Sequence, residues 1–231
     1  MDEPLPDEVV LSVRGEAQRA VAPDAAVLHG QLSAFALSKG EALALVRAAQ
    51  DALVSTLSGL GGVPLTADAE RAGLTWSVTS VGTHDERNYD PEATAGRIFA
   101  TADLRVAVRD LAQLDAVADA LGRLPALHLH GVGWTVDPDN PAWPAVRAAA
   151  IEAAIAKGRD YAVALGGAVR RVQQVADAGL LGGEDAIVGF DAVRGPMAFG
   201  ASAAMPTLDP VPQQLHAVIE ARLIADVPPL A

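Results

Sequence analysis

Apolar and polar residues alternate with a period of two along most of the chain's strand-like stretches. The alternation predicts strands with one buried face. It is clearest at residues 9–14, 26–34, 98–108 and 215–226, and shorter runs begin at Leu74, His128 and Val169. Residues 22–24 form a turn between the first two runs, and we expect these two strands to be antiparallel to each other.

Apolar residues spaced three and four apart predict two helices that follow strands. The first has a capping box at Ser38 and Glu41, a stripe that begins at Ala42, and an end at Gly61 and Gly62. The second begins at Asp110, which we expect to act as its cap with Gln113 as the partner.

A third, alanine-rich helix at about residues 141–165 is the element around which the chain is organised. Asp139 or Asn140 is predicted to cap it. Its expected stripe is Ile151, Ala154, Ile155, Gly158, Ala162 and Leu165. We expect Ile151, Ile155 and Leu165 to be buried against a sheet. Glycine inside a helix costs about 1 kcal/mol relative to alanine, so a backbone or an aromatic ring should lie against Gly158.

The order of these elements predicts an α+β fold with two-layer helix-on-sheet packing and mixed or antiparallel sheets. Three helices are too few to cover both faces of one large sheet. Residues 1–231 are predicted to form a single domain, with two small α+β lobes as the alternative. Residues 177–209 are rich in Gly, Ala and Pro and lack a clear period, which predicts a long loop.

The apolar residues of this predicted loop suggest a role in association. Exposed apolar side chains favour collapse or binding, and aromatic residues dominate interface energetics. We therefore predict that Phe190 and Phe199 are contacts between the subunits of a homo-oligomer. The alternative is that the loop folds back over its own domain.

Charge and composition argue against several classes of protein. Lys and Arg number 17 against 29 Asp and Glu, and a net charge of −12 repels the phosphates of nucleic acids. Without cysteine there is no disulfide, thiolate metal site or cysteine nucleophile. No signal peptide or membrane-spanning run is visible. We expect a cytoplasmic protein, or a periplasmic or secreted one if an export signal has been removed.

Six segments occur in an order and spacing that point to a known family. They are residues 10–17, 21–28, 104–111, 131–136, 164–166 and 210–225. Together they resemble the SIMPL domain family, also called DUF541, which includes Brucella outer-membrane antigens and a mammalian adaptor. The resemblance implies an α+β fold, a bacterial, often exported protein, and self-association. It implies no established enzymatic activity and supplies no catalytic residues.

Two histidines on one predicted strand are the only candidates for a metal site. His128 and His130 lie two residues apart, so both side chains point to one face, and His29 or Asp137 could supply a third zinc ligand. Apolar residues 132, 134 and 136 share that face in a regular strand. We therefore favour partly buried, hydrogen-bonded histidines, and predict no metal and no cofactor.

Other polar groups favour structural interpretations. His84, Asp85 and Glu86 predict a solvated turn, and with Asp90 they lack the spacing of a calcium loop. The chain has no Gly-x-Ser-x-Gly elbow and no Lys-Ser/Thr phosphate loop. Trp76 and Trp134 are predicted to be core residues.

Three functions remain open at this point. The first is a non-enzymatic, self-associating protein with an accessory role in stress or the cell envelope. The second is a small-molecule or metal-binding protein with a cleft near His128 and His130. The third is an enzyme of an unrecognised type. We favour the first, because no catalytic motif is found and the family resemblance implies self-association.

Overall fold

The computed structural model describes residues 8–86, 96–181 and 207–229. Within these ranges, three α-helices and eight strands form the predicted α+β fold. They divide into two compact units. We call residues 8–21, 137–181 and 212–229 the terminal unit, and residues 22–86, 96–136 and 207–211 the central unit.

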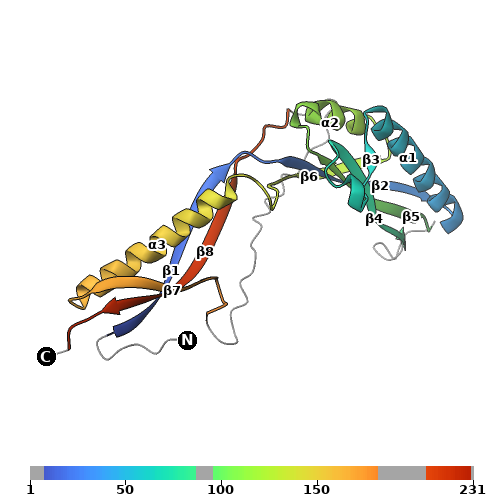
Figure 1. Cartoon of the computed structure of the whole chain (residues 1–231). Helices are drawn as coiled ribbons and strands as arrows, with labels where there is room; N and C mark the ends of the chain where they lie inside the picture. Colours follow the sequence, from blue (N-terminus) through green and yellow to red (C-terminus); the bar gives the residue numbers. More distant parts are fainter. Residues whose placement is uncertain (1–7, 87–95, 182–206, 230–231) are drawn as a thin grey trace. The chain divides into compact units, whose positions relative to one another are not determined.

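The terminal unit is a three-stranded antiparallel sheet with one helix on it. β1 (Glu8–Val21) and β7 (Ala168–Asp177) flank β8 (Gln213–Asp226). The helix α3 (Trp143–Ala164) runs along one face of this sheet, mainly over β1 and β8 (Figure 1). Their shared core consists of Leu11, Val13, Ala154, Ala162, Ala221, Leu223 and Ala225.

The buried stripe of α3 differs from the predicted one. Its buried residues follow a four-residue spacing and are Val146, Ala150, Ala154, Gly158 and Ala162. Ile151 and Ile155 are only half-buried, and Leu165 is 39% exposed, so the prediction that these three residues are buried is wrong. The physical reason is that small residues let the helix approach the sheet more closely than isoleucine would allow, so the isoleucines lie on its flank.

Two glycines permit this close approach. A Cβ atom built on Gly15 of β1 would overlap the backbone of Ala150 and Ala154. One built on Gly158 would overlap Leu223 Cδ1 of β8. The predicted contact at Gly158 therefore exists, but its partner is an aliphatic side chain rather than a backbone or an aromatic ring. The contact between backbones occurs at Gly15.

The central unit is a five-stranded mixed sheet with two helices on one face (Figure 1). Its strands, in spatial order, are β3 (Val63–Pro64), β4 (Leu74–Asp85), β5 (Ile98–Val108), β2 (Ala25–Ala36) and β6 (Leu127–Thr135). The helices are α1 (Lys39–Gly59) and α2 (Leu114–Gly122). Larger side chains fill this core, including Leu28, Leu32, Leu53, Leu57, Val106 and Leu121. Trp76 and Trp134 pack against it as predicted.

Several local predictions are confirmed and others are corrected. Ser38 Oγ accepts a hydrogen bond from Glu41 N and caps α1. Asp110 caps the short 3₁₀ helix Leu111–Gln113 that precedes α2, rather than α2 itself. Asn140 Oδ1 accepts from Ala142 N at the start of α3. β4 continues to Asp85, through residues that we expected to form a loop.

The predicted pairing of the first two strands is wrong. β1 pairs with β8 over its full length, whereas β2 pairs with β5 and β6 in the other sheet. Alternation of apolar and polar residues shows that a strand has a buried face, but it carries no information about the partner strand. The turn at residues 22–24 therefore leads from one unit to the other instead of closing a hairpin.

We predict that Gly15→Ala lowers the free energy of unfolding by about 1–3 kcal/mol, because its Cβ would overlap a backbone that cannot rotate away. The matched control is Gly40→Ala in α1, where an added Cβ meets nothing within 4 Å. The control should be neutral or stabilising by up to about 1 kcal/mol. Urea unfolding followed by circular dichroism measures both. Equal stability of the two variants would contradict the close approach of α3.

Candidate functional site

The face of the central sheet opposite α1 and α2 carries several polar side chains of the sheet. The strand register aligns residues of β2, β5 and β4 in three rows across this face. The rows are Gln31–Asp103–Ser80, His29–Arg105–Ser77 and Val27–Ala107–Thr75. We call this surface the open face, since both described helices of the unit pack on the other side.

Asp103 is the centre of the first row. Its two carboxylate oxygens accept hydrogen bonds from Gln31 Nε2 at 2.8 Å and Ser80 Oγ at 2.5 Å. These bonds, first that of Ser80 and then that of Gln31, hold the pKa of Asp103 below its ordinary value. A smaller contribution comes from the positive charge of His130. Asp103 is therefore an ionised hydrogen-bond acceptor that joins β2, β4 and β5.

The two histidines considered as weak candidates for metal binding lie on β6, at the edge of the central sheet. His128 and His130 are both exposed, so the prediction that they are partly buried is wrong. A bulge leaves His130 unpaired and shifts the register of β6, so Val132 and Trp134 pack on the helix-covered side instead of sharing the histidines' face. Among residues 8–86, 96–181 and 207–229, no group of three or more His, Asp or Glu could hold a metal ion.

His84 is part of an aromatic cluster at the other end of the open face, rather than a solvated turn. Its ring stacks on Phe99 with centroids 5.2 Å apart and 3° between the planes. Phe99 also contacts Phe35 at 5.6 Å, and the Arg97 guanidinium lies 5.0 Å from the Phe35 ring centre. Arg97 pairs with Glu86 at 2.9 Å. Asp90 lies outside the described residues.

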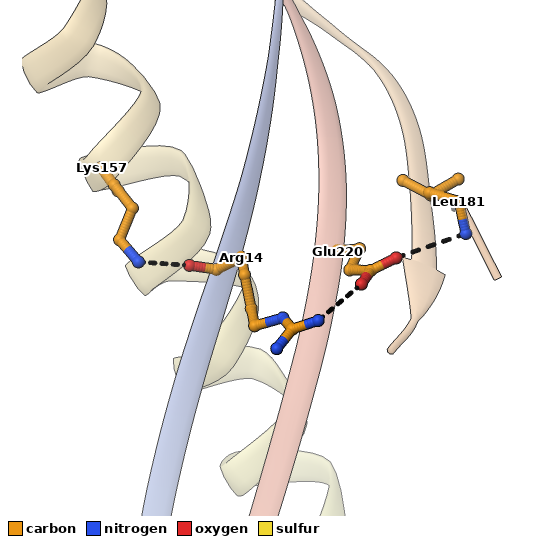
Figure 2. Close-up of polar contacts among 4 residues, drawn as sticks. All are labelled: Arg14, Lys157, Leu181 and Glu220. Carbon is orange, nitrogen blue, oxygen red and sulfur yellow. Dashed lines mark hydrogen bonds and ion pairs between the residues drawn. The ribbon is translucent and has the colours of Figure 1, made fainter. Parts of the chain in front are cut away.

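The terminal unit has a polar network centred on Glu220 (Figure 2). Glu220 Oε1 lies 3.0 Å from Arg14 Nη2, and its Oε2 accepts a hydrogen bond from Leu181 N at 3.3 Å. Arg222 Nη2 donates to Leu181 O at 3.0 Å. The hydrogen bond from Arg14 is the main cause of the lowered pKa of Glu220. The network holds the segment after β7 against strand β8, which is a structural role.

Lys157 of α3 extends this network to the edge of the sheet (Figure 2). Its Nζ donates a hydrogen bond of 2.7 Å to Arg14 O on β1. β1 is an edge strand, and it pairs with β8 over 14 residues without a bulge. A lysine across such an edge hinders the addition of another strand there.

An apolar surface lies on the other side of α3. Val172 and Val175 of β7 pair with Leu223 and Ala221, so they point to the face on which α3 packs. They are nevertheless 43% and 44% exposed, because α3 lies mainly over β1 and β8. Helical geometry places Ile151 and Ile155 on the flank of α3 opposite Lys157. We call Ile151, Ile155, Val172 and Val175 the β7-side strip.

The predicted contacts between subunits fall in the segment after β7. Phe190 and Phe199 lie outside the described residues, as does most of the predicted loop at residues 177–209. Asp177, its first residue, is the last residue of β7. Asp137, proposed as a third metal ligand, belongs to the terminal unit, whereas His128 and His130 belong to the central unit.

Comparison with known proteins identifies the family. Residues 11–223 match the SIMPL family, described as a protein of unknown function (DUF541). The match covers most of the 231 residues, and the chain belongs to this family, as the sequence predicted. No curated protein matches the chain. Among the described helices, none is long and apolar enough to cross a membrane.

Sequence reasoning missed the Asp103 cluster and the β7-side strip. The alternation in residues 98–108 does place Asp103 on the polar side of its strand. Its partners Gln31 and Ser80 are 72 and 23 residues away, and only the register brings them together. The exposure of Val172 and Val175 depends on where α3 lies across the sheet, and no local pattern reports that position.

We predict that Ser80→Ala raises the pKa of Asp103 toward its ordinary value of 3.8. Because the folded-state pKa is lowered, these hydrogen bonds stabilise the fold above the unfolded pKa, and this contribution is lost as pH falls through the folded pKa. Carboxyl carbon chemical shifts measured by NMR during an acid titration report the pKa of Asp103. Ser55→Ala, on the exposed surface of α1, is the control and should leave the pKa of Asp103 unchanged. An Asp103 that titrates at or above 3.8 in the parent protein would contradict the cluster.

Proposed function

We propose that this SIMPL-family protein acts without catalysis, as a self-associating protein whose copies meet through the β7-side strip. The observation that carries the proposal is the exposure of Val172 and Val175 on the sheet face that α3 covers elsewhere. Apolar side chains gathered on one surface are typical of an interface. The family resemblance, which implies self-association, supports the same conclusion.

A second copy of the chain suits this surface better than a partner of opposite charge. With a net charge of −12, two copies repel each other at long range, so a stable contact between them has to come from apolar burial. A two-fold axis places the same patch of each copy against its counterpart. The β7-side strip is made of branched aliphatic side chains, which can pack against an identical set.

The contact is expected to form through side chains rather than by joining the two sheets. β7 is an edge strand, but its pairing with β8 shifts register twice, between Val169 and Arg171 and between Val172 and Gln174. Such bulges bend an edge and disfavour the addition of a further strand. Lys157 covers part of the opposite edge, at Arg14 O. Both edges of the sheet therefore disfavour pairing with the strands of further copies. This favours a closed oligomer over a filament.

The carboxylates with shifted pKa values support the non-enzymatic part of the proposal. Asp103 and Glu220 both titrate below their ordinary values. A general acid or base works best with a pKa near the operating pH. A lowered pKa instead keeps a carboxylate ionised as a hydrogen-bond acceptor, which suits groups that hold strands together.

The test is the solution mass of a double variant, Val172→Thr with Val175→Thr, measured by size-exclusion chromatography with light scattering. Threonine keeps the β-branched shape but adds a hydroxyl that is costly to bury without a partner. The parent should have a mass that is a multiple of 23.7 kDa, and the variant should shift toward that value with an unchanged circular dichroism spectrum.

The matched control replaces exposed valines of the central unit, Val63→Thr with Val81→Thr. It should keep the mass of the parent. A monomeric parent would refute self-association, and a folded double variant of unchanged mass would remove the β7-side strip from the interface. The site of action in the cell, cytoplasmic or periplasmic, remains a prediction, as does a role in stress or at the envelope.

A further inference from the structure

The outer edge of β1 is long and regular. β1 pairs with β8 over 14 residues without a bulge, and no described strand lies on its other side. The Arg14 carbonyl points away from β8 and accepts a hydrogen bond from Lys157 (Figure 2). In an antiparallel pair, a residue directs both of its backbone groups either toward the partner strand or away from it, and the direction alternates along the strand. The N–H and C=O groups of residues 10, 12, 14, 16 and 18 therefore point outward.

Lys157 makes the one hydrogen bond that protects the middle of this edge. Its Nζ lies 2.7 Å from Arg14 O. In the part of the chain that the structure describes, no other group hydrogen-bonds to the outward backbone groups of residues 10–18. A long edge strand is a template for pairing with another chain, and a lysine on the edge is a common protection against it. Lys157 therefore occupies the place of the N–H group that an incoming strand would supply.

The sequence of β1 is complementary to itself in the antiparallel direction. A two-fold axis at Gly15 places Arg14 of one copy opposite Glu16 of a second copy, and this pair of opposite charges occurs twice. The backbone groups of both residues point outward, so the same register forms the hydrogen bonds of a regular antiparallel pair. Arg14 already pairs with Glu220 at 3.0 Å, but a guanidinium group has five N–H donors and can bind a second carboxylate. A second copy of the chain therefore fits this edge.

The position and composition of α3 suit the same arrangement. Because α3 lies over β1 and β8, two β1 strands paired at about 4.8 Å would bring the two helices to about 10 Å from each other. Packed helices are typically about 8–10 Å apart. Ala149 and Ala153 precede Lys157 at four-residue steps and lie on the same flank of α3. Gly15 lies against Ala150, so an axis at Gly15 places these small flank residues of the two helices beside each other.

We infer that Lys157 prevents the β1 strands of two copies from pairing about Gly15, at an edge that is otherwise complementary to itself. Pairing would replace the hydrogen bond from Lys157 to Arg14 O by one from Glu16 N of the second copy. It would also leave two lysine charges between the packed helices, and burying an unpaired charge is costly. This edge and the β7-side strip lie on opposite sides of α3. Lys157 therefore limits association to surfaces other than the β1 edge.

The experiment compares solution masses of the full chain at matched concentration, with circular dichroism to check folding. Lys157→Ala, at an exposed helical position, should raise the mass at least about twofold, because a two-fold contact joins two of the units that the parent forms. Lys157→Arg keeps a charged donor and should keep the mass of the parent. Lys39→Ala, which changes the exposed second lysine of the chain, is the matched control. A folded Lys157→Ala variant with the mass of the parent overturns the inference.

Further changes in the Lys157→Ala background identify the surface. Ser12→Pro removes an outward N–H group, which an edge strand tolerates, and should restore the mass of the parent. Glu16→Arg places like charges opposite each other in the inferred register and should also restore it. A larger mass that persists in either variant overturns the assignment. The test is separable from the proposed function, because Lys157→Ala should raise the mass of the Val172→Thr, Val175→Thr variant as well, whether or not the β7-side strip joins copies.

Discussion

The close approach of α3 to β1 and β8 is the contact on which the terminal unit depends. It requires Gly15 on the strand and Gly158 on the helix, where a Cβ would overlap neighbouring atoms. Close packing of small residues gains many dispersion contacts, although each side chain buries little area. It also moves larger residues away from the contact. The isoleucines of α3 lie on its flank, and the valines of β7 stay partly uncovered.

The central unit has the same two-layer design but a different core. Leucines of α1 and α2 fill the space above the sheet, including Leu53, Leu57, Leu114 and Leu121. Large side chains keep a helix farther from its sheet, and their area supplies the stabilisation. The helix-covered face of the central sheet is therefore filled by side chains of the same unit. The open face is held together by polar rows, of which Gln31–Asp103–Ser80 is hydrogen-bonded across three strands.

Residue patterns predicted the helices, the strands and the fold class, but not which strands pair with each other. The periods of two and 3.6 identified all three helices and every strand except the short β3 (Val63–Pro64), because burial of one face dictates those periods. The pairing of β1 with β8 joins residues about 200 positions apart, and no local signal encodes it. The bulge at His130 likewise escaped prediction, and it placed Val132 and Trp134 on the face opposite to the one expected.

Three of the arginines have structural roles. Arg14, Arg97 and Arg170 each pair with a carboxylate of the same unit, at 3.0, 2.9 and 2.7 Å. These pairs are partly exposed and each contributes little to stability, but they fix the positions of edge strands and chain ends. Arg105 has no such partner in the described chain, although acidic residues outnumber basic ones by 29 to 17. Because Arg105 is exposed, water can satisfy its N–H donors, and it is the three paired arginines that hold parts of the fold in place.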